Sequence, residues 1–176
     1  MDFTLADLKL QLDQRVSGLS VQGVAMAKHT NAVEVLGLSI FGEARNESMD
    51  GRAAVAHTAM NRSLTRGHSV DERCLQKSQY SCWYEFGGKA NYDRLMELAR
   101  KVLKRESLGS DAALFNECKW IAAGVIGGQL IDHTKGSTHY LTTALYYRQP
   151  PVAWTVGHTP VAVIGAHSFF KGVAWS

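Results

Sequence analysis

The sequence has little proline and cysteine, and it has no long apolar run. All three prolines lie at position 150 or later, so residues 1–149 can form helices without interruption. No apolar run reaches the length of about 18 residues that marks a transmembrane helix, so no stable membrane insertion is expected. Cys74, Cys82 and Cys118 are odd in number and form no CxxC pair. Free thiols are therefore expected, although Cys74 and Cys82 are near enough in sequence to pair in an oxidising compartment.

A strong excess of one charge is also lacking. The 19 Lys and Arg residues and the 16 Asp and Glu residues give a net charge of +3. The basic residues are scattered, and the one local run, at residues 100–105, has the spacing of a solvated helix face. A clustered basic stripe is typical of nucleic-acid-binding domains, so no nucleic-acid partner is expected. A weakly cationic surface would still be attracted to an anionic polymer.

The composition, with 45% hydrophobic and 20% charged residues in a chain of 176, is typical of a globular protein. The first residues, MDFTLADLKLQLDQR, lack the basic and then apolar segment of a secretory signal, so a cytoplasmic start is expected. Leucines recur at helical spacing in this segment. We therefore predict a helical extension over residues 1–30, packed on the body, and a main domain over residues 31–176.

Helical periodicity dominates the middle of the main domain. The expected helices cover residues 31–43, 49–62, 92–105 and 111–127, with a long irregular segment over residues 63–91. Ser48 and Asp111 are candidate N-caps. Residues 129–176 are rich in Gly, His, Thr and aromatic residues and contain short β-type stretches. The pattern predicts a mainly α (α+β) fold, a helical body with a small C-terminal cap of loops and a β-hairpin.

Glu43 is the most informative single residue. It follows Leu36 and Ile40 at helical steps, so its carboxyl group continues an apolar helix face. Apolar surroundings disfavour the charged form of a carboxyl group, and a protonated glutamic acid can donate its proton to a leaving oxygen. The structural alternative is that Glu43 forms an ion pair with Arg45 or Arg62.

Glu47 and Asp50 are the carboxylates that follow Glu43 most closely in sequence. Two carboxylates on one helix face cannot flank a sugar ring from opposite sides, as two-carboxylate glycosidases require. Glu47 is therefore expected to be a first-turn or solvent-facing acid. If Glu43 is catalytic, it is expected to act as a single acid and base.

The seven histidines raise the possibility of a metal site. They form no HExxH motif, and no Cys/His pair has zinc-ligand spacing. A site built from His139, His158 and His167 stays open and would make the protein a metal-dependent hydrolase. His139 and His167 lie in the stretches GSTHY and IGAHSFF, which suggests that they line a cleft or satisfy loop backbone groups.

Aromatic residues gather over residues 80–86 and 140–175. Aromatic faces can cover the apolar faces of sugars, and polar neighbours favour this role over core packing. The expected groove residues are Tyr80, Trp83, Tyr140 and Trp154. The expected core residues are Phe115, Phe169 and Phe170.

Five blocks, in order, resemble the SleB-type cell-wall hydrolases, the family of spore-cortex-lytic enzymes and related lysins. The first combines GEARNE at residues 42–47 with GRAAVA at 51–56 and NR at 61–62. The others are QYSCW at 79–83, GSTHY at 136–140, PVAW at 151–154 and IGAHSF at 164–169. Asn46 stands where Gly is common in the family, and Tyr80 stands where Phe is common. The resemblance covers about residues 33–172.

This resemblance implies a lysozyme-like helical fold and cleavage of the β-1,4 bond between N-acetylmuramic acid and N-acetylglucosamine in peptidoglycan glycan strands. Many members are lytic transglycosylases. In that reaction Glu43 would protonate the glycosidic oxygen and then accept the proton of the sugar's 6-hydroxyl, closing a 1,6-anhydro ring without a metal or cofactor. The candidate substrate-binding residues are Asn61, Gln79, Tyr80, Ser81, Trp83, His139, Tyr140, Trp154 and His167.

A lone domain of this kind suits a phage endolysin. It is expected to be a monomer in the host cytoplasm that reaches the periplasm and cell wall through a lesion made by a holin-type permeabiliser. Two other classes stay open. A metal-dependent cell-wall amidase or peptidase would lose activity on exhaustive chelation. A non-catalytic glycan-binding phage structural module would bind peptidoglycan without releasing soluble fragments.

Overall fold

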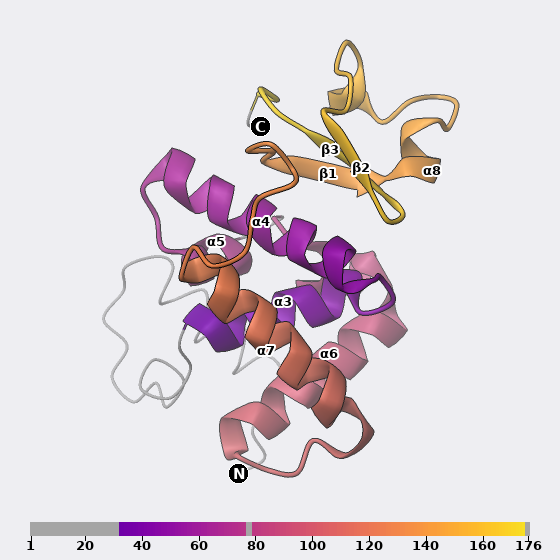
Figure 1. Cartoon of the computed structure of the whole chain (residues 1–176). Coiled ribbons are helices and arrows are strands. Elements are labelled where there is room, and N and C mark those ends of the chain that lie inside the picture. The colour runs from indigo at the N-terminus through magenta and orange to yellow at the C-terminus, as the bar shows by residue number, and fades with distance from the viewer. Residues whose placement is uncertain (1–31, 77–78, 175–176) are drawn as a thin grey trace.

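The computed structural model describes residues 32–76 and 79–174, in which a helical body carries a small sheet (Figure 1). The α-helices are α3 (Ala32–Ala44), α4 (Met49–Arg66), α5 (Val70–Leu75), α6 (Lys89–Lys104), α7 (Ala112–Ile126) and α8 (Thr143–Tyr146). Short 3-10 helices are η1 (Ser81–Trp83), η2 (Glu85–Gly87), η3 (Gly109–Asp111) and η4 (Ala153–Thr155). The strands are β1 (His139–Thr142), β2 (Ala162–Ile164) and β3 (His167–Phe170).

Three expectations from the sequence concern residues 1–30, membrane-spanning helices and the cysteines. The helix predicted within residues 1–30 lies outside the described residues. Among the helices of the two described ranges, none is both long enough and apolar enough to cross a bilayer. All three cysteines are buried free thiols, so Cys74 and Cys82 are not paired.

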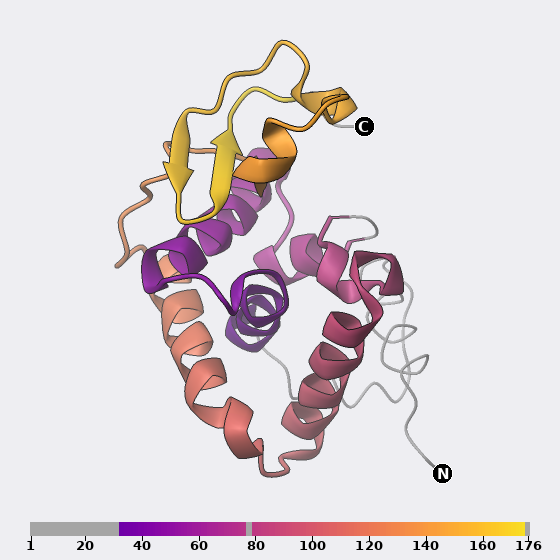
Figure 2. The ribbon, with the colours of Figure 1, turned by 90° about the vertical axis from the view of Figure 1, so that its right-hand side faces the viewer.

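α3 is the central helix of the body. Figure 2 shows it nearly end-on, with α7 on one side and α6 on the other. Leu36, Leu38, Ile40 and Phe41 are each at most 1% exposed, so α3 is apolar on several faces rather than along one stripe. A helix of this kind is buried by its neighbours. Its last turn carries Glu43, which is half-buried.

α4 begins where the sequence predicts. The Ser48 side chain accepts a hydrogen bond from Gly51 N (3.3 Å), which satisfies one of the free amides of the first turn. The helix continues past its predicted end at residue 62 and stops at Arg66, because Gly67 (φ 69°) is the first residue that closes it in left-handed backbone.

The helix α5 was not predicted, and one predicted N-cap does not form. The segment predicted to be irregular over residues 63–91 contains α5, whose start has a capping box between Ser69 and Glu72. The Ser-x-x-Glu signal for this capping box is present in the sequence. Asp111 does not cap α7 with its side chain and instead pairs with Arg94 of α6. The partner on a neighbouring helix therefore outcompetes the local cap.

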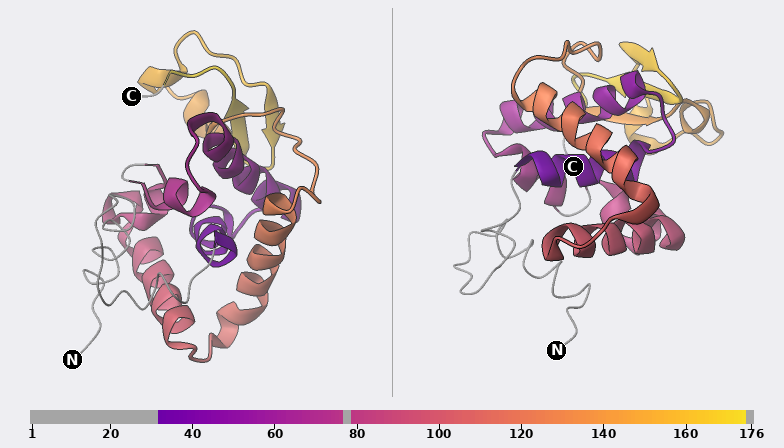
Figure 3. Two further views of the ribbon diagram at one scale, coloured as in Figure 1. Left: turned by 90° about the vertical axis from the view of Figure 1, so that its left-hand side faces the viewer. Right: turned by 60° about the horizontal axis from the view of Figure 1, so that its bottom comes forward.

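The C-terminal cap is a three-stranded antiparallel sheet in the order β1-β3-β2, where the sequence predicted one hairpin. β2 and β3 form that hairpin, and β1 pairs with the other edge of β3, from His139 opposite Phe170 to Thr142 opposite His167. All four residues of β3 are buried. Figure 3 shows the cap lying over α4, on the opposite side of the body from α6.

The Asp132 loop, residues 132–137, joins the cap to α4. Asp132 accepts hydrogen bonds from Thr134 N (2.7 Å) and Gly136 N (2.9 Å). Asn61 of α4 donates to Asp132 Oδ2 (3.0 Å) and to Ser137 O (3.0 Å). Asn61 was predicted to bind substrate, and the structure instead gives it the task of holding this loop. Burial alone raises the pKa of Asp132, but the hydrogen bonds from Thr134, Asn61 and Gly136 together lower it below its ordinary value.

We expect acid to destabilise the protein through this loop. Because the folded-state pKa of Asp132 lies below the unfolded one, its stabilisation is present above about pH 4 and is lost as the pH falls through the folded pKa. When the pH is lowered from about 6 to about 3, the urea concentration at the unfolding midpoint of the wild type should decrease. The midpoint of Asp132→Asn should decrease less over the same change of pH. The same pH dependence in both proteins would contradict this role.

Candidate active site

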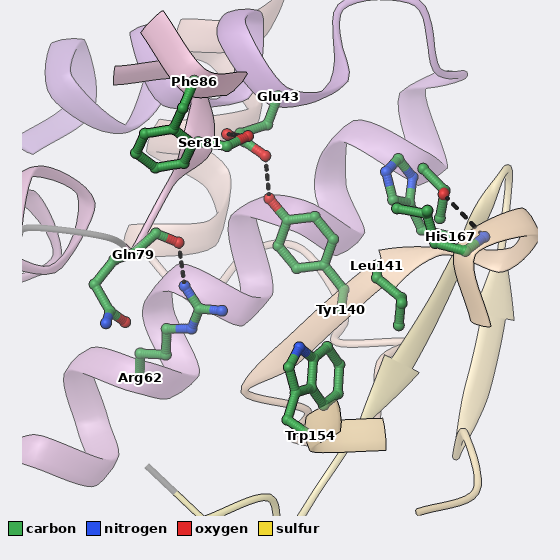
Figure 4. Close-up of a pocket in the computed structure, with 11 residues that line it drawn as sticks. Glu43, Arg62, Gln79, Ser81, Phe86, Tyr140, Leu141, Trp154 and His167 are labelled. Carbon is green, nitrogen blue, oxygen red and sulfur yellow. Dashed lines mark hydrogen bonds between the residues drawn. The ribbon is translucent and has the colours of Figure 1, made fainter. Parts of the chain in front are cut away.

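A cleft with a volume of about 380 Å³ lies between the helical body and the sheet cap (Figure 4). The body wall comes from the end of α3, from α4, and from the segment that contains η1 and η2. The cap wall comes from β1, α8, η4 and β3. The lining residues are Glu43, Arg62, Gln79, Ser81 and Phe86 on the body, and Tyr140, Leu141, Thr142, Leu145, Trp154 and His167 on the cap.

The Glu43 carboxyl group points into this cleft and is held from both sides. Its Oε1 accepts hydrogen bonds from Cys82 N (2.7 Å) and Ser81 Oγ (3.2 Å), and its Oε2 accepts one from Tyr140 Oη (2.9 Å). Gly42 makes the first contact possible, because a Cβ at this position would lie 2.7 Å from both Cβ and Sγ of Cys82. The body and the cap therefore meet at one carboxyl group.

Arg45 and Arg62, which the sequence suggested as ion-pair partners of Glu43, donate hydrogen bonds to other groups. Arg45 donates to Asn91. Arg62 donates to the backbone oxygens of Thr138 and Gln79. The hydrogen bonds of the Glu43 carboxyl group come instead from Cys82, Ser81 and Tyr140, and the group lines the cleft.

The contacts of Glu43 distinguish its two oxygens. A backbone amide only donates, so Oε1 must remain an acceptor opposite Cys82 N. Oε2 faces the Tyr140 hydroxyl, which can donate to a carboxylate or accept from a protonated acid. Burial raises the pKa of Tyr140 well above its usual value, so the hydroxyl keeps its own proton at neutral pH. Oε2 is thus the oxygen that can carry a transferable proton.

Glu47 is not the solvent-facing acid that the sequence predicted. Its side chain is 15% exposed and lies under the β2–β3 turn, where Oε2 accepts a hydrogen bond from Ala166 N (3.0 Å). Its Oε1 lies 3.7 Å from Nδ1 of His167, which lines the cleft and is 7% exposed. Burial lowers the pKa of His167, against the opposing effects of Glu47 and Glu43.

Two aromatic side chains offer apolar faces to a ligand. Trp154 lines the cleft, as predicted, and packs edge-on against Phe170 (ring centroids 5.2 Å apart). Phe86 is 75% exposed, lines the opposite wall and stacks on Tyr84 (5.3 Å). Phe86 was absent from the predicted site, although it belongs to the aromatic cluster of residues 80–86. Leu141, Thr142 and Leu145 were also missed, because nothing in their local sequence marks them.

Tyr80 and Trp83 belong to the core and not to the groove, which corrects the prediction. Tyr80 is 1% exposed and lies under the guanidinium of Arg62, 5.0 Å from its ring centroid. Trp83 is 5% exposed, and its Nε1 donates to Ser39 Oγ (3.0 Å). In the same segment Gln79 and Ser81 do line the cleft. Because η1 turns over α3, the side chains of Tyr80 and Trp83 lie in the core, whereas Gln79 and Ser81 line the cleft.

His139 supports the wall from behind. Its ring packs against Trp154 (centroids 5.6 Å apart), and its Nδ1 lies 3.0 Å from Thr138 Oγ1. Burial, with smaller contributions from Arg62 and His158, lowers the pKa of His139 to about 4, so the ring is neutral near pH 7. Across residues 32–76 and 79–174, no three His, Cys, Asp or Glu side chains are grouped as metal ligands, so His139, His158 and His167 form no such set.

Comparison with known proteins shows the family and the fold of the chain. The family model described as Cell Wall Hydrolase matches residues 46–170 and so begins just after Glu43. The crystal structure of the catalytic domain of the SleB protein of Bacillus cereus is similar, with a TM-score of 0.55 and 18% sequence identity, over 80% of this chain and 89% of that chain. At this identity the likeness shows the fold, which is mainly α and lysozyme-like, as predicted. No curated protein matches the sequence significantly.

Proposed function

The chain belongs to the SleB-type cell wall hydrolase family, whose members degrade peptidoglycan, and from this premise we propose that it is a lytic transglycosylase acting through Glu43. The proposed substrate bond is the β-1,4 link between N-acetylmuramic acid and N-acetylglucosamine. The observation that carries the proposal is the Glu43 carboxyl group in the cleft, with Oε1 fixed by Cys82 N and Oε2 opposite Tyr140.

The proposed reaction starts with proton donation. Glu43 delivers the proton on Oε2 to the glycosidic oxygen, the bond from that oxygen to C1 of the muramic ring breaks, and positive charge develops on the ring. The hydrogen bonds from Cys82 N and Tyr140 Oη then stabilise the carboxylate that forms. The 6-hydroxyl oxygen of the muramic ring then attacks C1, and its proton passes to the Glu43 carboxylate, which closes the 1,6-anhydro ring and restores the acid.

The arrangement of carboxylates favours ring closure over the two-carboxylate route. Among the described residues that line the cleft, Glu43 is the one carboxylate. Glu47 lies under the β2–β3 turn, and Asp50 lines a separate cavity. A two-carboxylate glycosidase needs a second acid across the sugar from the first. An internal hydroxyl nucleophile removes the need for a carboxylate that holds water there.

The cleft also has the chemistry of a sugar site. Phe86 and Trp154 face it from opposite walls and can cover the apolar faces of two sugar rings. Gln79 and Ser81 supply polar groups on the body wall. Apolar faces flanked by a few polar groups are the usual pattern of a small-ligand site.

Analysis of the products tests this proposal. Purified sacculi should be digested in H₂¹⁸O and the soluble muropeptides measured by mass spectrometry. We expect 1,6-anhydro muropeptides, which lack one water and carry no ¹⁸O, because the nucleophile belongs to the sugar. Reducing ends labelled with ¹⁸O would instead show hydrolysis and overturn the transglycosylase assignment. Peptides released without cleaved glycans would point to an amidase or peptidase.

Other finer assignments remain our proposals. They include a monomeric state, a role as a phage endolysin, and passage from the host cytoplasm to the cell wall through a holin-type permeabiliser. The separation into an N-terminal extension over residues 1–30 and a catalytic domain over residues 31–176 also stays a prediction.

A further inference from the structure

The side chain of Glu47 fills a space that exists because two neighbouring residues are glycines. A Cβ at Gly51 would lie 2.8 Å from the Glu47 Cβ, and a Cβ at Gly165 would lie 2.2 Å from its Oε2. Gly165 also has a φ of 59°, which a side chain would strain. With Oε2 bonded to Ala166 N, the carboxylate is fixed and its Oε1 faces His167. The sequence therefore leaves space for this acid at two separate positions, Gly51 and Gly165.

His167 is a buried base on the wall of the cleft. Its Nδ1 is buried without a hydrogen-bond partner within 3.5 Å and has Glu47 Oε1 at 3.7 Å, so a small shift completes the pair. A carboxylate beside Nδ1 places the imidazole proton there and leaves Nε2 as the acceptor. The lowered pKa keeps the ring neutral near pH 7, as an acceptor must be.

The position of His167 relates it directly to Glu43. Its ring meets the edge of Tyr140 (centroids 5.4 Å apart), and the hydroxyl of the same tyrosine holds Glu43 Oε2. Figure 4 shows Glu43 and His167 flanking Tyr140 along the cleft. The charged groups that act on His167 are Glu47, from the loop after α3, and Glu43, from α3 itself. A substrate against Tyr140 therefore meets an acid and a base together.

We propose that His167, oriented by Glu47, is the base that accepts the proton of the muramic 6-hydroxyl while Glu43 acts as the acid. The inference rests on the proposed function and goes beyond it, because there Glu43 alone was expected to donate and then accept. The C1–O bond of the glycoside breaks as the oxygen takes the Glu43 proton. The 6-oxygen bonds to C1 and its proton passes to Nε2 of His167. The imidazolium then loses this proton to solvent and Glu43 regains one, so the cycle is balanced.

In this scheme Glu47 is a positioning residue and His167 a catalytic one. Removing Glu47 leaves the imidazole present but free to turn or to change tautomer. Loss of the Glu47 side chain should lower kcat less than loss of the His167 side chain does, and KM should change little. A role of Glu47 confined to the fold would instead lower the unfolding temperature without separating kcat from KM.

The test is chemical rescue of the full-length protein acting on purified sacculi. His167→Ala creates a space for free imidazole, and His167→Gln keeps the side-chain bulk if the alanine variant fails to fold. We expect kcat to fall about 100-fold in both, with KM nearly unchanged. Imidazole should restore at least about tenfold activity to His167→Ala, in proportion to its neutral fraction as pH is varied. Glu47→Gln should lose about tenfold in kcat, and His68→Ala, an exposed histidine, should match the wild type.

Two outcomes overturn the inference. One is a folded His167→Gln variant whose kcat stays within about threefold of the wild type. The other is a folded His167→Ala variant whose lost activity imidazole does not restore. Failure of the proposed function looks different, because the wild type itself would then release no 1,6-anhydro product.

Discussion

Replacing Glu43 with glutamine should lower the release of soluble muropeptides by at least about 10³-fold, with the fold intact. General acid catalysis contributes about 10² to 10⁴ in rate, and an amide at neutral pH has no acidic proton to give. The amide can keep the local geometry, because its oxygen can accept from Cys82 N and its NH₂ group can donate to Tyr140 Oη. The unfolding temperature should therefore change little while turnover is lost.

The matched control for this experiment is Glu85→Gln. Glu85 is an exposed carboxylate on η2 of the same wall, and it does not line the cleft. Its change to glutamine has the same chemistry and should leave turnover at the wild-type level. Muropeptide release by a folded Glu43→Gln variant at more than about a tenth of the wild-type rate would refute Glu43 as the acid.

Replacing Arg62 with methionine should give the largest loss of stability. The guanidinium of Arg62 joins three parts of the molecule, because it donates to Thr138 O beside β1 and to Gln79 O before η1, and it stacks on Tyr80. Methionine keeps much of the apolar volume but leaves two carbonyl groups without this donor. An unsatisfied buried acceptor costs about 1–3 kcal/mol, so a loss of about 3 kcal/mol is expected.

Differential scanning calorimetry measures this effect. A loss of about 3 kcal/mol should lower the Tm by about 6–12 °C in a domain of this size. Arg148→Met, at an exposed position after α8, is the matched control and should leave the Tm within about 2 °C of the wild type. Because Arg62 spans both walls of the cleft, we also expect KM to rise. An unchanged Tm in Arg62→Met would contradict its role as a cross-link.

Much of the helical body could be predicted from the sequence because its signals are local. The apolar spacing around Leu36 and Ile40, the cap at Ser48 and the stop at Gly127 act within one or two turns of the chain. The same holds for Glu43, which continues an apolar face and stands in the GEAR block. Where local signals competed with distant partners, prediction failed, as at Asp111, which pairs with Arg94 instead of capping α7.

The order of the late strands and the membership of the cleft could not be predicted in this way. Tyr80 and Ser81 are adjacent in sequence, yet one lies in the core and the other faces the cleft, because η1 turns over α3 at this point. The burial of Glu47 depends on Gly165, more than a hundred residues away, which lets the β2–β3 turn close over it. Nothing near Glu47 in sequence carries that information.

The sequence by itself determined the helical class of this protein and its family, and it singled out Glu43 as the candidate acid. Only the tertiary structure decided which face of each aromatic residue is open, that Asn61 anchors a loop, and that Glu47 meets His167. The physical reason is range: helix periodicity and capping depend on neighbours a few residues apart. A cleft is made by the packing of distant segments. This packing decides which polar groups are buried and which groups they contact.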